Sequence, residues 1–154
     1  MMSTYSWLCE FEERDRVRDQ QNALRLHKAK IVREKLPGLW RDLQDHLRDK
    51  ANAYRLRFPL NRVAGPGVNS SLCAVSKSDY PAVSLKLRCH GEDGTQISIE
   101  WWRKEDGNAE EKSESGVIAV ITDNNDNAYL SYGGLTQAEA IAEHLLGHVV
   151  CSFH

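Results

Sequence analysis

The sequence predicts an α+β fold: a long N-terminal helical segment of two helices, an antiparallel meander sheet of about five strands, and a C-terminal helix packed on the sheet. Three observations predict it. Residues 10–35 contain no Gly or Pro and favour a helix. The middle of the chain alternates apolar and polar residues with the period of a strand. A helix-capping pattern follows the last of these strands.

The length and composition fit one folded domain preceded by a helical arm. A chain of 154 residues with 41% hydrophobic and 27% charged residues has an ordinary globular composition. Residues 1–36 form the predicted basic arm, and residues 37–154 form the predicted α+β domain. Within the arm, Val17, Leu24 and Ile31 recur every seven residues. The partner positions of this heptad are polar, so the arm carries at best a weak coiled-coil seam.

The second predicted helix follows an interruption at Leu36-Pro37-Gly38, where Pro37 is suited to the first position of a new helix. Apolar residues then recur at steps of three and four, with Asp and Arg between them, which indicates an amphipathic helix with one buried stripe. This helix is expected to end near Pro59, before a loop rich in Pro and Gly.

The predicted sheet occupies the middle of the chain. In residues 81–89 apolar and polar side chains alternate, as in a half-buried strand. Further strands are predicted within residues 71–77, 97–103, 116–122 and 128–132. Because the connections between them are short, neighbouring strands should run antiparallel.

The last helix is predicted from Thr136 and Glu139, which form a capping box. Its apolar residues fall on one arc of the helical wheel. His144, His148 and Cys151 fall together on the opposite arc, away from the core. These residue types bind zinc, so a metal site is one interpretation and a solvated helix face is the plain one. The sequence between the two His lacks the carboxylate of a zinc protease motif.

The charge is unevenly distributed along the chain. The net charge is −2, but 13 basic and 6 acidic residues lie between Arg14 and Arg57, whereas residues 92–114 hold 8 acidic and 3 basic ones. The two parts can attract each other within one molecule or between copies, or the basic part can bind an acidic partner. Five basic residues share one side of the arm and suggest nucleic-acid binding as an alternative function. They are Arg14, Arg18, Arg25, Lys28 and Lys35.

The cysteines and the apolar runs indicate the cellular compartment of the protein and whether it associates with a membrane. Cys9, Cys73, Cys89 and Cys151 are irregularly spaced, so we interpret them as reduced thiols of a cytoplasmic protein, with a disulfide pair as the alternative. No apolar run approaches the ~20 residues of a membrane span, and the first residues lack the pattern of a secretory signal. We therefore expect no membrane association.

The second face of the sheet points to a binding role. Trp102 and Tyr129 are expected there, opposite the face that the helices cover. The arm, a second subunit, a partner protein or a small ligand could cover them. No motif indicates a reaction or a cofactor. The sequence therefore predicts a small non-catalytic protein that binds a protein partner or itself, as a homo-oligomer, through Val17, Leu24, Ile31, Trp102 and Tyr129.

Overall fold

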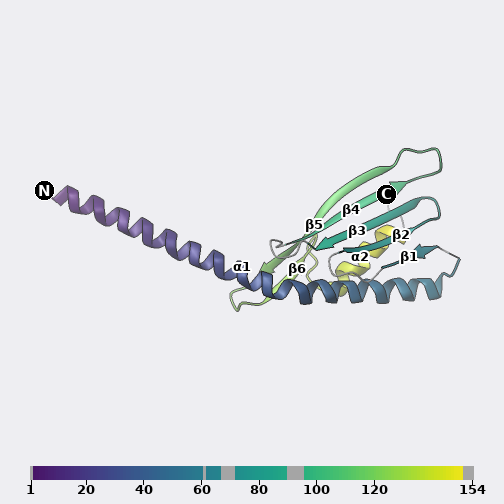
Figure 1. Cartoon of the computed structure of the whole chain (residues 1–154), viewed down its shortest axis with the longest axis horizontal. Coiled ribbons are helices and arrows are strands. Elements are labelled where there is room, and N and C mark those ends of the chain that lie inside the picture. Colours follow the sequence, from purple (N-terminus) through teal and green to yellow (C-terminus); the bar gives the residue numbers. More distant parts are fainter. Residues whose placement is uncertain (1, 61, 67–71, 90–95, 151–154) are drawn as a thin grey trace.

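The computed structural model describes residues 2–60, 62–66, 72–89 and 96–150, with side chains from residue 6 onward. It confirms the predicted α+β class: one long helix, an antiparallel sheet and a C-terminal helix follow in that order (Figure 1). The elements are α1 (Met2–Arg57), β1 (Val63–Ala64), β2 (Leu72–Lys77), β3 (Ala82–Cys89), β4 (Gln96–Lys104), β5 (Lys112–Thr122), β6 (Ala128–Ser131) and α2 (Ala138–Val150).

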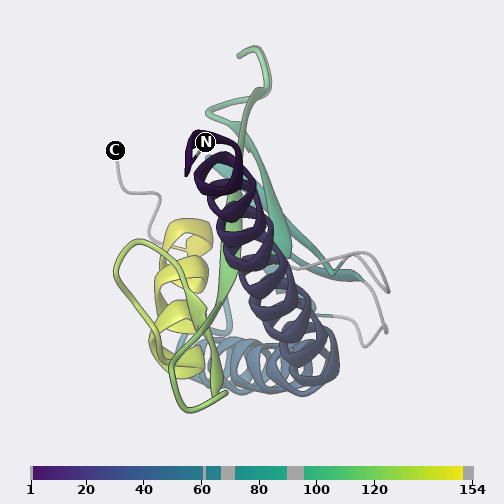
Figure 2. The same cartoon turned by 90° about the vertical axis from the view of Figure 1, so that its left-hand side faces the viewer.

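The N-terminal segment is one helix of 56 residues, not two. Pro37 lies inside it. A proline within a helix removes one backbone hydrogen bond and bends the axis. Figures 1 and 2 show this bend between the purple N-terminal part of α1 and its blue C-terminal part. Leu36 and Trp40 on either side of Pro37 are buried, so packing holds the helix together across the proline.

The sheet has six antiparallel strands in the order of the sequence. Five correspond to the predicted strands, and β1 adds a sixth of two residues, too short to show a period in the sequence. Gly65 follows β1 with φ of 90°, and a Cβ there would lie 2.2 Å from the carbonyl oxygen of Ala74. Only glycine permits this approach to β2.

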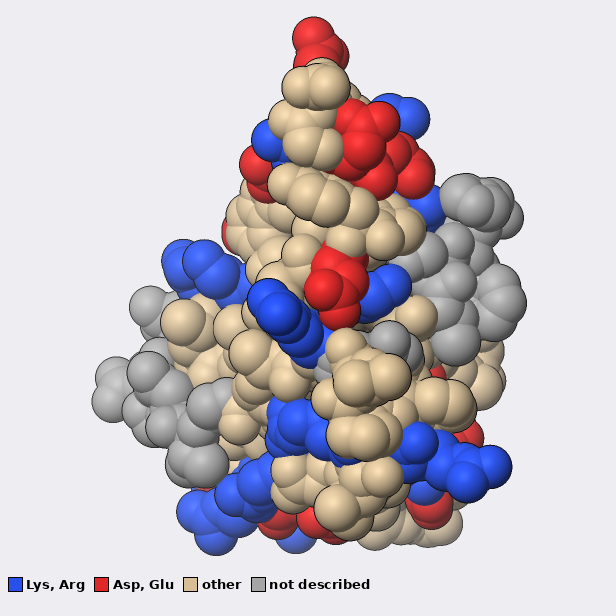
Figure 3. Space-filling view, turned by 90° about the vertical axis from the view of Figure 1, so that its right-hand side faces the viewer, with Lys and Arg blue, Asp and Glu red and all other residues tan. Residues whose placement is uncertain are grey.

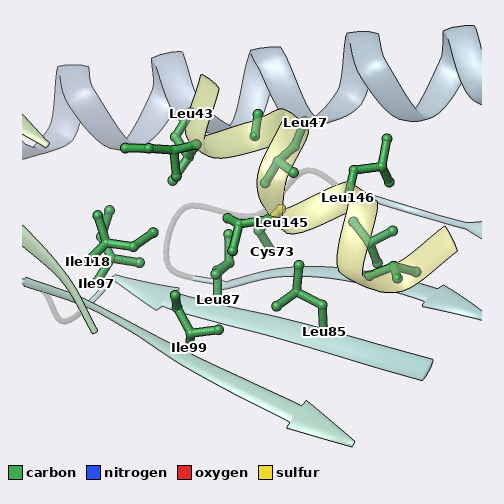
Figure 4. Packing of buried hydrophobic residues seen from close by; sticks show 14 of the residues in the cluster. Leu43, Leu47, Cys73, Leu85, Leu87, Ile97, Ile99, Ile118, Leu145 and Leu146 are labelled. Carbon is green, nitrogen blue, oxygen red and sulfur yellow. The ribbon is translucent and has the colours of Figure 1, made fainter. Parts of the chain in front are cut away.

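The core lies between the sheet and the two helices. The C-terminal part of α1 and α2 cover the same face of the sheet (Figure 1), and Figure 4 shows their leucines facing those of β3. Lys50 of α1 lies 2.8 Å from Glu139 and 2.9 Å from Glu143, which ties α1 to α2. The fully buried leucines and isoleucines of this core are Leu43, Leu47, Leu85, Leu87, Ile97, Ile99, Ile118, Leu130, Ile141 and Leu145.

The N-terminal part of α1, residues 6–28, projects away from the rest of the molecule (Figures 1 and 2), every side chain in it is exposed, and its last turn meets the β5–β6 turn, where His27 Nε2 lies 3.1 Å from Asp126 Oδ2. We call these residues the arm from here on. The arm does not cover the second face of the sheet, where Val117 and Ile121 stay 45% and 39% exposed. Among the described residues, no helix has both the length and the apolar character that a membrane span requires.

Candidate functional site

A cleft of about 530 Å³ opens on the concave face of the sheet, next to the C-terminal part of α2. Its volume falls within the range of about 300–1,000 Å³ that is usual for small-molecule sites. Strands β3, β4 and β5, the segment after β6, and α2 all contribute to it. It is lined by Val83, Trp101, Arg103, Glu105, Lys112, Glu114, Tyr132 and His148.

The strand register explains why the inward-facing side chains change from apolar to aromatic and charged at this end of the sheet. Along β4 the inward-facing side chains run from the buried Ile97 and Ile99 to Trp101 and Arg103. On β5, Glu114 pairs with Trp101 and Lys112 pairs with Arg103. The same face is therefore an apolar core at one end and an aromatic, charged cleft wall at the other.

Four rings form a row from the sheet to α2. The ring centroids of Trp101 and His148 lie 4.9 Å apart, those of His148 and His144 4.8 Å, and those of His144 and Tyr132 5.7 Å. Tyr132 is held there by a tight turn, because its backbone N–H and C=O both bond to Leu135. The two residues of the turn between Tyr132 and Leu135 are Gly133 and Gly134, and both have a positive φ.

The charged side chains of the cleft carry both signs. Arg103 Nε lies 2.8 Å from Glu105 Oε1, and the Arg103 side chain is only 22% exposed. Lys112 and Glu114 are exposed on β5. Figure 3 shows the end of the molecule where the β4–β5 loop projects: acidic atoms gather around the loop, and basic atoms lie lower down. In Figure 1 this loop and the arm lie at opposite ends of the molecule, so the basic residues of the arm are far from these acidic ones.

The environment shifts the pKa of two of these groups. Burial lowers the pKa of His148, the neighbouring His144 lowers it further, and Glu114 acts in the opposite direction. Burial raises the pKa of Tyr132, and Glu114 adds to the rise. At neutral pH His148 is therefore an uncharged imidazole and Tyr132 an uncharged phenol. Both can exchange hydrogen bonds with a ligand without contributing charge.

The predicted metal ligands are only partly where the sequence placed them. His144 is exposed as expected, but His148 is half-buried against Trp101 and does not point freely into solvent. The sheet extends beyond the middle of α2, so its Trp101 meets the helix face that the wheel assigned to solvent. Cys151 lies outside the described residues. No group of three His, Cys, Asp or Glu suited to a metal occurs among the residues described, and the zinc site stays a prediction.

The predicted partner-binding residues divide into three places. Val17 and Leu24 are 41% and 54% exposed on the arm. Ile31 is 7% exposed where α1 joins the domain, so little of its side chain is accessible to a partner. Trp102 and Tyr129 are half-buried on the second sheet face, apart from the arm. Lys86 Nζ lies 5.2 Å from the centre of the Trp102 ring and shields part of it.

The predicted nucleic-acid stripe is exposed but mixed with acids. Arg14, Arg18, Arg25, Lys28 and Lys35 are all exposed. Arg18 is paired with an aspartate one turn away, at 2.6 Å. The stripe therefore presents less free positive charge than its sequence suggests, and nucleic-acid binding stays a prediction.

Two sets of residues escaped the sequence reasoning. The first is the cleft wall, which depends on cross-strand register. The second is an apolar tip on the arm, where Trp7, Leu8 and Phe11 are 45–56% exposed and the rings of Trp7 and Phe11 lie 4.8 Å apart. The spacing of four between two aromatic residues was a readable signal for that tip.

Comparisons with known proteins give no match: no protein-family model, no curated protein and no solved structure is similar to this chain. The function is therefore inferred from the geometry of the cleft and of the arm.

Proposed function

We propose that this protein is a non-catalytic binding protein that associates with a second copy of itself through its arm. One observation carries the proposal. Val17 and Leu24, large apolar side chains seven residues apart on the arm, are 41% and 54% exposed. In proteins most of the stability of a helix comes from the packing of one of its faces, and every side chain of the arm is exposed in the monomer. A partner that covers part of the arm would supply that packing.

The charges of the arm and of the two turns that follow it favour an antiparallel partner arm. Residues 6–20 hold five acidic and three basic residues, a balance of −2. Residues 21–35 hold five basic residues and one acidic residue, a balance of +4. Two arms side by side in the same direction would bring like charges together. Two antiparallel arms, related by a two-fold axis, bring the acidic part of each to the basic part of the other.

Val17 and Leu24 define the register of the pair. They lie within about 20° of each other on the helical wheel, so one seam can contain both. With Val17 opposite Leu24 of the second copy, the two-fold axis also places Leu24 opposite Val17. Residues 7–11 then lie level with residues 30–34 of the second copy, where α1 enters the domain. Trp7, Leu8 and Phe11 lie about 80°, 180° and 120° from Val17 on the wheel, so these three side chains stand outside the seam.

Glu10 and Lys28 add a specific ion pair to this arrangement. They are 18 residues apart, which is five full turns, so they share one angle on the wheel. In an antiparallel two-fold pair, residues at the same angle lie on the same side of the seam. In the register above, Glu10 lies about 4.5 Å along the axis from Lys28 of the second copy, within reach of both side chains.

The test is the mass of the protein in solution, measured by light scattering over a wide concentration range. We expect a dimer, and we expect Leu24→Glu to shift the protein to the monomer. Leu26→Glu is the matched control, because Leu26 is 66% exposed and lies about 160° from Leu24 on the same helix. A wild-type protein that stays monomeric at every concentration would refute self-association.

A charge exchange tests the orientation. Glu10→Lys and Lys28→Glu should each weaken the dimer, since each places like charges across the seam. The double variant should restore it, because the pair is re-formed with opposite sign. A double variant weaker than both single variants would contradict the antiparallel register.

The cysteines support the proposed cytoplasmic location. Cys9, Cys73 and Cys89 are free thiols, and such thiols persist in a reducing compartment.

A further inference from the structure

We propose that the cleft at the end of the sheet binds a small aromatic molecule that carries one anionic group. The inference concerns a site away from the arm, and it does not depend on the proposed self-association. It follows from the pairing of Arg103 with Lys112 in the sheet and from the aromatic wall beside them.

The anionic group is assigned to the end of the cleft where β4 meets the start of β5. Arg103 and Lys112 lie directly opposite each other in the antiparallel ladder, and both line the cleft. Like charges on directly opposed residues destabilise a sheet. Glu105 offsets part of this repulsion through its contact with Arg103. A ligand anion near Lys112 would reduce this repulsion further, and it would be held by charge-assisted hydrogen bonds.

The aromatic body of the ligand is assigned to the inner part of the cleft. Trp101 and His148 form one continuous ring contact on the cleft wall, and Tyr132 lines the cleft as well. Aromatic walls of this kind favour flat apolar groups, which stack or meet them edge-on. Uncharged His148 and Tyr132 add hydrogen-bonding groups that fix the orientation without selecting for charge.

Glu114 sets the direction of the ligand in the cleft. It pairs with Trp101 in the ladder, and its charge acts on both Tyr132 and His148. A ligand anion at the aromatic end would meet this carboxylate and be repelled. The anion is therefore expected at the Lys112 end only, with the ring against Trp101.

The test uses three probes with the same ring system: 2-naphthoate, its neutral amide, and 2-naphthylmethylammonium. Binding is followed by two-dimensional NMR, with the indole N–H of Trp101 as the reporter. Trp102 is the internal control, because it follows Trp101 in β4 and faces the other side of the sheet. We expect naphthoate to bind roughly tenfold more tightly than the amide, and the ammonium compound to bind more weakly still.

Matched variants separate the two halves of the site. Lys112→Gln should remove most of the advantage of naphthoate over the amide, whereas Lys104→Gln, on the other face of β4, should leave it unchanged. Trp101→Phe should weaken all three complexes, and Trp102→Phe should weaken none. Both tryptophan variants keep an aromatic ring, and their folding is to be checked by circular dichroism.

Each result of the probe series either supports or overturns the proposed ligand site. A probe series in which the amide or the ammonium compound binds as tightly as naphthoate would overturn the anion assignment. Shifts at Trp102 but not at Trp101, or no shift with any probe, would overturn the site itself. Loss of dimerisation in the Leu24→Glu variant leaves these expectations unchanged, so the two proposals fail independently.

Discussion

Replacing Leu47 with Ala tests the packing that holds α1 on the sheet and thereby gives the cleft its shape. Leu47 is fully buried in the core cluster that α1, α2 and the sheet share. Figure 4 shows its side chain between the two helices. Truncation of a buried leucine costs about 2–5 kcal/mol, and the cost is higher where the surroundings cannot collapse. Leu47 is enclosed by two helices and a sheet, so we expect about 3 kcal/mol.

The assay is urea unfolding followed by circular dichroism at a fixed protein concentration, since association adds to apparent stability. For a chain of this size, about 3 kcal/mol corresponds to a fall in Tm of roughly 6–12 °C. Leu26→Ala is the control: Leu26 is 66% exposed, and its truncation should change the free energy of unfolding by less than about 0.5 kcal/mol. A Leu47→Ala variant as stable as the control would refute the packing of α1 on the sheet.

Three further predictions follow from the same contacts. His148 should titrate by NMR with a pKa below 6.5, and Glu114→Gln should lower it further, because Glu114 favours the charged imidazole. The unfolded chain binds this proton more readily than the folded protein, so protonation of His148 should lower the free energy of unfolding as the pH falls from about 6.5 to the folded pKa. A His148→Gln variant whose stability has the same pH dependence as the wild type would contradict this expectation. In a Cys151→Ser background, a thiol reagent should label the exposed Cys9 at once. The buried Cys73 and Cys89 should react only on unfolding, since burial raises the pKa of Cys73 to about 11. Rapid labelling of three thiols in the folded protein would contradict the burial of these two cysteines in the core. If the basic stripe binds nucleic acid, the protein should bind duplex DNA at low salt, and the affinity should fall steeply with added salt. The absence of binding at low salt would refute nucleic-acid binding.

The elements that the sequence predicted well are those with a strong local period. The alternation in residues 81–89 and 97–103 predicted β3 and β4, because one face of each strand is buried by the helices. The capping box at Thr136 predicted α2, which begins two residues later at Ala138. Local patterns of this kind need no knowledge of the rest of the chain.

The features that escaped prediction depend on tertiary contacts. Pro37 was expected to end a helix, but the burial of Leu36 and Trp40 keeps α1 continuous. Every side chain of the arm is exposed, and the heptad spacing of Val17, Leu24 and Ile31 did not show that Ile31 lies beyond the arm. The cleft arises from the register of β4 against β5, which places Lys112 opposite Arg103 across a loop of seven residues. No local period encodes that register.

The distance between the two copies of Cys9 in the dimer tests the central proposal most directly. Cys9 is an exposed thiol on the arm, and a spin label attached to it in a Cys151→Ser background leaves the buried Cys73 and Cys89 unlabelled. In the antiparallel pair Cys9 lies opposite residue 32 of the second copy, so the two labels should be about 35 Å apart by electron paramagnetic resonance. A separation below about 20 Å would indicate parallel arms, and the absence of any dipolar coupling at high concentration would contradict self-association through the arm.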